Sequence, residues 1–275
     1  MGTLAYDAAR LAEGVCHLRQ VNANLADRRK VKTVIVIAHR GASGYAPENT
    51  LAAFKRALAL GATFIETDLQ LSRDSHFVAI HDDTVNRTTN GQGKVHDLSL
   101  VELRRLDAGS WFGSEFAGER IPTLPEILEF AKKHDAVFYL ELKPSGSWGG
   151  EHTLIGALRS SGEIARTIVI SFDPSILEAV RKIEPTVMTG LLFDGQIELP
   201  LQRAVEIGAR QLAMRGDLVT PALLAEARKH DLQVVCWTVN QPAHMRLLIE
   251  AGVDGIMSDY PDRLVAARPK EKSTP

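Results

Sequence analysis

The stretch VIVIAHRGASGYAPENTLAAFKRAL, residues 34–58, contains a strand followed at once by a helix. Residues 34–38 are apolar and rich in β-branched side chains, which is typical of a parallel strand buried on both faces. Alanine and leucine then recur at helical spacing from residue 52 to residue 58. His39 and Arg40 are therefore predicted at the carboxyl end of a buried strand.

The rest of the chain repeats this alternation of short apolar runs and helical patterns. Strands are predicted near residues 34–38, 63–71, 77–81, 137–142, 167–171, 187–191, 211–214, 233–237 and 254–257. Strand-helix alternation indicates a parallel sheet covered by helices, and about 230 residues of it favour a single closed barrel. One of these strands is surplus to an eight-stranded barrel.

The surplus strand is identified by the length of its connection. Residues 63–71 and 77–81 are joined by only five residues, Ser-Arg-Asp-Ser-His, whereas a parallel crossover needs about a dozen. These two strands must form an antiparallel hairpin. We therefore predict an α/β fold, a distorted TIM (β/α)8 barrel with one extra hairpin strand. A turn centred on Arg73 and Asp74 would place His81 opposite Glu66, to within one residue of register.

Composition narrows the class of protein. With 275 residues and a formal net charge of -2, the chain resembles an ordinary soluble globular protein and not a nucleic-acid binder. Its two cysteines, Cys16 and Cys236, form no CxxC motif, so we expect neither a disulfide framework nor a thiolate metal site. No apolar run is long enough to span a membrane, and the first residues lack the apolar core of a secretory signal. We therefore expect a cytoplasmic protein, with a homodimer as one option for its oligomeric state.

Three segments differ from the alternating pattern. Residues 1–30 carry a leucine-rich stripe and are predicted to form an amphipathic helical extension of the barrel domain, residues 31–265. Residues 266–275 are predicted to be a disordered tail. Residues 83–122 are rich in Gly, Asn, Thr and Asp and interrupt the barrel after the hairpin, where we predict a small inserted lid containing Trp111 and Phe112. Within it, residues 98–109 read as a short helix.

Acidic residues gather at two strand ends. Glu66 and Asp68 are two residues apart and so lie on the same face of their strand, and Glu141 and Lys143 share a face of the next barrel strand. An isolated pair of this kind could simply face solvent. Inside a barrel, however, it needs neutralisation. Three carboxylates without a cysteine favour a hard divalent cation, Mg²⁺ or Ca²⁺.

Two of the nine histidines, His39 and His81, end strands at the face where such barrels build their active sites. A pair of imidazoles there is suited to proton transfer, because one can remove a proton from a nucleophile while the other protonates a leaving oxygen. The other histidines have no neighbouring constellation and are interpreted as surface or packing residues.

Several motifs together resemble the glycerophosphodiester phosphodiesterase family, and most closely its short cytoplasmic bacterial members. They are HRGASGYAPENT, the run GATFIETDLQLSRDSHFVAIHDDTVNRTTNGQG, LDAGSWF, IPTLPEIL, LELKP, ISFD, WTVN and GVDGIMSDYP, which together cover about residues 34–262. One departure is Ser75, where the family usually has glycine at the hairpin turn.

The resemblance implies hydrolysis of a glycerophosphodiester, such as glycerophosphocholine or glycerophosphoethanolamine, to sn-glycerol 3-phosphate and an alcohol. It also implies roles for individual residues. His39 and His81 become the acid-base pair, Arg40 and Lys143 the phosphate contacts, and Trp237 a wall of the substrate pocket. The divalent cation, Mg²⁺ or Ca²⁺, would be held by Glu66, Asp68 and Glu141.

The sequence leaves the route and the substrate open. Attack could come from a metal-activated water or from the 2-hydroxyl of the substrate, which would give a cyclic phosphate; the resemblance favours the second. A lysophospholipase D or a sphingomyelinase D-like phosphodiesterase would use the same residues but needs an apolar entrance or a membrane anchor, and neither is visible in the sequence. A barrel that binds glycerophosphodiesters without turnover is disfavoured because no histidine or carboxylate is lost.

Overall fold

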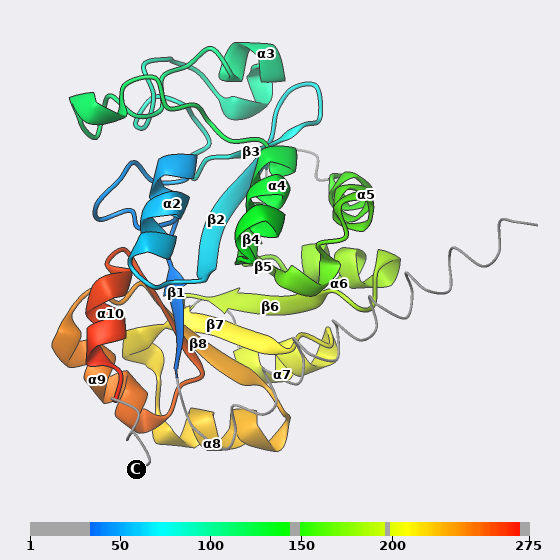
Figure 1. Cartoon of the computed structure of the whole chain (residues 1–275). Helices are drawn as coiled ribbons and strands as arrows, with labels where there is room; N and C mark the ends of the chain where they lie inside the picture. Colours follow the sequence, from blue (N-terminus) through cyan, green and yellow to red (C-terminus); the bar gives the residue numbers. More distant parts are fainter. Residues whose placement is uncertain (1–33, 144–148, 196–198, 270–275) are drawn as a thin grey trace, which may run out of the picture.

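The computed structural model describes residues 34–143, 149–195 and 199–269, and this part of the chain forms a β/α barrel (Figure 1). The strands are β1 (Ile35–Ala38), β2 (Phe64–Leu71), β3 (Phe77–Ala79), β4 (Val137–Leu142), β5 (Thr167–Ser171), β6 (Met188–Phe193), β7 (Gln211–Arg215), β8 (Gln233–Trp237) and β9 (Gly255–Ser258). The α-helices are α2 (Leu51–Ala59), α3 (Leu100–Leu103), α4 (Leu124–His134), α5 (Glu151–Ser161), α6 (Pro174–Ile183), α7 (Pro200–Glu206), α8 (Pro221–Lys229), α9 (Pro242–Ala251) and α10 (Pro261–Ala267).

The barrel closes through β1, which pairs in parallel with both β2 and β9. The sheet order is β1-β9-β8-β7-β6-β5-β4-β2-β3, so every strand except β3 belongs to the parallel ring. The fold predicted from the alternation of strands and helices is confirmed, and the strand bounds agree with the prediction to within one or two residues at most ends.

Side chains of alternate residues fill the barrel interior. Ile35, Ile37, Tyr139, Ile170 and Val235 belong to one buried cluster inside the ring, whereas a larger buried cluster packs the strands against the outer helices. Because the side-chain period of a strand is two, residues further along the same inward rows emerge at the carboxyl end of the barrel. The site described below lies on those rows.

The hairpin exists, with a register one residue away from the expected one. Leu69 faces Ala79 and Leu71 faces Phe77, so the turn centres on Asp74. In this register His81 lies beyond the end of β3, level with Thr67 and not with Glu66. Ser75 occupies the turn with a φ of 63°, in the left-handed region where glycine is preferred, which explains why glycine suits this position.

The insertion between β3 and α4 has a small hydrophobic core of its own. Val85, Val95, Leu103 and Ala108 pack with Val78 and Ile80 of the hairpin segment. Figure 1 shows the segment at one end of the barrel, beyond the hairpin. Its helix is shorter than predicted, because α3 ends at Leu103 and residues 104–109 form turns. The Asp107 carboxylate accepts hydrogen bonds from the backbone N–H groups of Gly109 and Gly118, which favours a turn over a continued helix.

The terminal predictions fall mostly outside the described residues. The helical extension predicted for residues 1–30 lies wholly outside them, as do residues 270–275 of the predicted tail. At the predicted boundary, α10 continues to Ala267, two residues beyond residue 265. Among the helices that the structure describes, none is both long and apolar enough to cross a membrane.

Candidate active site

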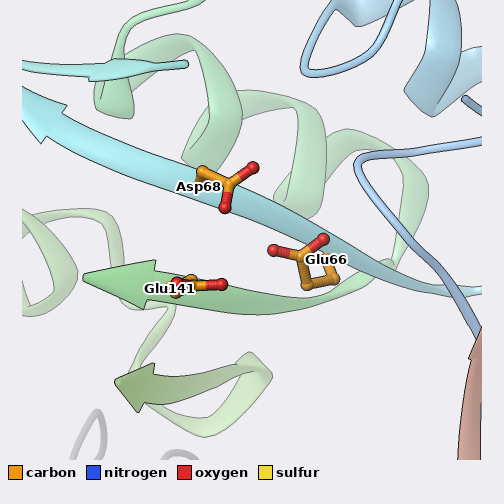
Figure 2. Close-up of side chains that lie close together, drawn as sticks. All are labelled: Glu66, Asp68 and Glu141. Carbon is orange, nitrogen blue, oxygen red and sulfur yellow. The ribbon is translucent and has the colours of Figure 1, made fainter. Parts of the chain in front are cut away.

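Three carboxylates from two neighbouring strands, β2 and β4, lie close together (Figure 2). Glu66 and Asp68 lie on one face of β2, and Asp68 pairs in register with Glu141 of β4. One oxygen of each carboxylate lies within 4.8 Å of the others, and all three residues are buried. Glu66 Oε1 is buried and has no hydrogen-bond partner. An orphaned oxygen beside two further carboxylates fits a cation with oxygen ligands.

The environment separates the pKa values of these three groups. Burial and the charges of Asp68 and Glu141 raise the pKa of Glu66 well above its usual value. Burial and Asp68 likewise raise the pKa of Glu141, to about 7. For Asp68, burial is outweighed by Lys143 and Arg40, which hold its pKa below the usual range. Without a cation, the surroundings therefore favour the ionised form of Asp68 and the protonated forms of Glu66 and Glu141.

Two basic residues compensate the acidic centre. Lys143 Nζ lies 2.9 Å from Asp68 Oδ1 and also contacts Glu141 Oε1. Arg40 Nε lies 3.3 Å from Asp68 Oδ2, and the Arg40 backbone N–H donates to Glu66 Oε2 at 2.8 Å. The acids and the lysine predicted from spacing thus form one charge network with Arg40.

The loop after β1 adopts an uncommon backbone that makes these contacts. Arg40 has a φ of 55° and Asn49 a φ of 57°, both in the left-handed region. Such residues cost energy and collect at functional sites. Asn49 uses its conformation to donate from Nδ2 to Asp68 Oδ2 at 2.8 Å while its Oδ1 accepts from Thr67 Oγ1. The next residue, Thr50, caps α2 by accepting from the Ala53 N–H. The PENT motif therefore both begins a helix and holds a carboxylate.

His39 is oriented by a carboxylate that the sequence analysis did not single out. Its Nδ1 lies 2.7 Å from Asp259 Oδ1, and Asp259 also accepts from Ser43 Oγ and Asn240 Nδ2. Burial opposes ionisation of Asp259, but the hydrogen bonds from His39 and its other donors lower its pKa to about 2. Because an ionised carboxylate can only accept a hydrogen bond, His39 Nδ1 must carry the proton, and Nε2 remains available for another contact. His39 Nε2 lies 4.0 Å from Glu66 Oε2, at the edge of the acidic centre.

His81 has a matching partner. Its Nδ1 lies 2.8 Å from Asp82 Oδ1. Asp82 receives two hydrogen bonds from the Arg87 guanidinium, which hold the Asp82 pKa far below its usual range. Burial lowers the pKa of His81, with Asp68 acting in the opposite direction. Asp68 is thus close enough to influence this imidazole, and both histidines present Nε2 with Nδ1 held by an aspartate.

Trp237 ends β8 on the inward row and contacts the interior cluster. Its ring packs edge-on against Phe172 with centroids 5.5 Å apart, and its indole Nε1 is buried without a hydrogen-bond partner. The adjacent Thr238 Oγ1 lies 3.5 Å from His39 Nε2, so this strand end borders the same site. An aromatic side chain at this strand end is suited to pack against the carbons of a polyol.

The aromatic pair expected in the lid has internal contacts. Trp111 Nε1 donates to the Ala108 carbonyl at 2.9 Å, and its ring packs edge-on against Phe112 with centroids 5.6 Å apart. Trp111 is 40% exposed. That the insertion covers a bound substrate stays a prediction.

Comparison with known proteins gives a consistent result. Residues 39–263 match the family described as the glycerophosphoryl diester phosphodiesterase family. A glycerophosphodiester phosphodiesterase of Caldanaerobacter subterraneus is 44% identical over 234 residues, which cover 84% of this chain and 96% of that protein. A Bacillus subtilis protein of the same name is 33% identical over 83% of this chain and 84% of its own length.

Solved structures agree with the sequence match. An Oleispira antarctica phosphodiesterase, solved in complex with the product sn-glycerol-3-phosphate, has a TM-score of 0.78 and 32% identity, covering 86% of this chain and 96% of that one. A glycerophosphodiester phosphodiesterase of Agrobacterium tumefaciens has a TM-score of 0.77 and 30% identity, with coverage of 85% and 99%.

Proposed function

The chain belongs to the glycerophosphoryl diester phosphodiesterase family, and on this premise we propose that it hydrolyses glycerophosphodiesters to sn-glycerol 3-phosphate and an alcohol. Glycerophosphocholine and glycerophosphoethanolamine are the proposed substrates. The observation that carries this proposal is the pair of aspartate-bound histidines, His39 and His81, beside a buried acidic centre. The product named for the Oleispira antarctica structure supports the same reaction.

Glu66, Asp68 and Glu141 would hold one divalent cation, Mg²⁺ or Ca²⁺. The all-oxygen donor set and the unpartnered Glu66 Oε1 fit either ion. When bound, the cation supplies positive charge against the phosphate oxygens and lowers the barrier to attack on phosphorus. Because a carboxylate ligand must be ionised and the surroundings of Glu66 favour its protonated form, cation affinity should rise with pH.

The histidines move the protons. With Nδ1–H bonded to an aspartate, each ring offers Nε2 to the substrate, and each aspartate favours the charged ring that forms after proton uptake. One histidine removes the proton from the attacking hydroxyl, and the other protonates the leaving alcohol oxygen. Arg40 and Lys143 already face Asp68 and would contact the phosphate as the scissile bond breaks.

Of the two routes, we favour the one in which the substrate's own 2-hydroxyl is the nucleophile. The glycerol 2-oxygen then bonds to phosphorus, the P–O bond to the alcohol breaks, and that alcohol leaves with a proton from a histidine. Water opens the resulting cyclic phosphate in a second step, with the histidine roles exchanged. Trp237 would enclose the glycerol carbons and so favour substrates that carry this hydroxyl.

Histidine variants test this proposal. His39→Ala and His81→Ala should each lower kcat on glycerophosphocholine by roughly a hundredfold or more, with smaller changes in KM. The double variant should be little worse than the weaker single variant. His76→Ala is the matched control, because His76 is an exposed residue of the hairpin turn. Near-normal turnover in a folded His81→Ala variant would require another acid or base.

A further inference from the structure

Arg87 connects two groups of the proposed site without being part of it. It lies in the inserted segment, and its guanidinium donates four hydrogen bonds to two carboxylates. Nε and Nη2 donate to Asp82 at 2.7 and 2.9 Å, while Nη1 and Nη2 donate to Glu48 at 2.8 Å each. These planar pairs match the fork geometry of arginine, which a lysine cannot reproduce.

Each of these carboxylates has a second partner at the site. Asp82 Oδ1 lies 2.8 Å from His81 Nδ1, and Glu48 Oε1 accepts from Arg40 Nη1 at 2.8 Å. Two chains of contacts therefore run from Arg87, one to the imidazole of His81 and one to the guanidinium of Arg40. Most of the guanidinium's donors are already used by carboxylates, so a direct bond to substrate is not its role.

The contacts from Arg87 through Glu48 to Arg40 depend on the charge of Arg87. The Glu48 side chain is only 13% exposed and lies between two arginines. Burial disfavours its charged form, yet the hydrogen bonds and charges of Arg87 and Arg40 outweigh this and keep the Glu48 pKa below its usual value. Without Arg87 this carboxylate loses two of its hydrogen bonds, and Arg40 loses a fixed partner.

We propose that Arg87 is a positioning residue, which holds His81 through Asp82 and Arg40 through Glu48 in a fixed relation to each other. The inference rests on the proposed function, because it concerns the geometry of that reaction. In this proposal the insertion supplies a guanidinium that joins the proposed proton-transfer group to the proposed phosphate contact.

A matched control lies in the same segment. Arg104 also anchors the insertion to the barrel, because it donates to the Ile121 carbonyl at 2.7 Å and to Glu126 of α4 at 2.6 Å. Those contacts involve no residue of the proposed site. Arg104→Ala should therefore show the loss of activity caused by loosening the insertion alone. Arg87→Ala should show that loss together with the loss caused by misplacing His81 and Arg40.

Steady-state kinetics on glycerophosphocholine test the proposal. We expect Arg87→Ala to lower kcat about tenfold or more through His81 and also to raise KM through Arg40, because small misplacements of reacting groups are costly. Arg87→Lys should not restore activity. Guanidinium ion at tens of millimolar should restore part of kcat in Arg87→Ala and leave Arg104→Ala unchanged. The proposal is overturned if the two alanine variants lose activity equally and guanidinium restores neither.

A measurement without substrate separates this inference from the proposed function. The ¹⁵N chemical shifts of the His81 ring in the substrate-free protein report how firmly Nδ1 keeps its proton and its bond to Asp82. They should move in Arg87→Ala and stay unchanged in Arg104→Ala. If the wild-type chain does not hydrolyse glycerophosphocholine but these shifts respond as expected, only the proposed function fails. Unchanged shifts in Arg87→Ala would contradict the positioning role itself.

Discussion

Replacing Glu66 with glutamine should remove cation binding without weakening the cation-free protein. Glu66 is 1% exposed, and its pKa is raised well above the usual value by burial and by its acidic neighbours. In the cation-free protein its surroundings therefore favour the protonated form, and glutamine is nearly isosteric with that form. The amide oxygen can still accept the Arg40 N–H. We expect the free energy of unfolding in chelator to stay within about 1 kcal/mol of the wild type.

The variant should differ from the wild type in how much an added cation stabilises it. At a cation concentration a hundred times its Kd, binding stabilises the wild type by about 2.7 kcal/mol. If losing one ligand weakens binding by about a hundredfold, the same concentration equals the variant's Kd and contributes only about 0.4 kcal/mol. For a chain of this size these values correspond to Tm increases of roughly 5–11 °C and 1–2 °C.

Thermal unfolding with Mg²⁺, Ca²⁺ or chelator measures both quantities. Glu163→Gln is the matched control, since Glu163 is also buried but hydrogen-bonds to Arg166 outside the site. It should lower Tm equally with and without cation. A full cation-dependent increase in the Tm of Glu66→Gln would show that Glu66 is not a ligand. A loss of several kcal/mol in chelator would refute the inference that the surroundings of Glu66 favour its protonated form.

Three further predictions concern pH, the hairpin turn and the substrate. The raised pKa of Glu141, about 7, means that the folded chain keeps this proton where the unfolded chain has lost it. The resulting stability is present below the ordinary glutamate pKa and is lost as pH rises through about 7, so urea unfolding in chelator should show a decline from pH 5 to pH 8 that is smaller in Glu141→Gln. Ser75→Gly should raise the free energy of unfolding by about 1 kcal/mol, because Ser75 holds a φ of 63°; a lower Tm would contradict this. Glycerophosphocholine, glycerophosphoethanolamine and glycerophosphoglycerol should have kcat/KM values within roughly tenfold, about 1.4 kcal/mol, if the alcohol projects outward, and bis(p-nitrophenyl) phosphate should be far poorer.

The sequence predicted the parts of the fold and site that depend on local periodicity. Residues two apart on a strand share a face, which placed Glu66 with Asp68 and Glu141 with Lys143. The short connection after Leu71 identified the hairpin. The hairpin register was predicted to within one residue, and the observed register differs by that one residue because the turn centres on Asp74 in a five-residue connection whose geometry composition alone does not determine. The helix expected through residue 109 stops at Leu103, since Asp107 binds nearby backbone N–H groups instead.

The aspartates that hold the histidines were missed for a different reason. Asp259 is 220 residues from His39, and only closure of β1 against β9 brings them together. Asp259 continues the inward-facing row of Gly255 and Met257, which would predict that it faces the site. This row can be identified only once the strand bounds are known. Asp82 adjoins His81 in sequence, yet its pairing with Arg87 depends on how the insertion folds back over Glu48.

Product analysis with glycerophosphocholine tests the central claim most directly. The purified chain is incubated with this substrate in Mg²⁺, in Ca²⁺ or in excess chelator, and the products are identified by mass spectrometry, with lysophosphatidylcholine as the lipid comparison. The account predicts sn-glycerol 3-phosphate and choline with at least one of the cations, none in chelator, and little turnover of the lipid. Release of phosphocholine, full activity in chelator, or faster cleavage of lysophosphatidylcholine would contradict it.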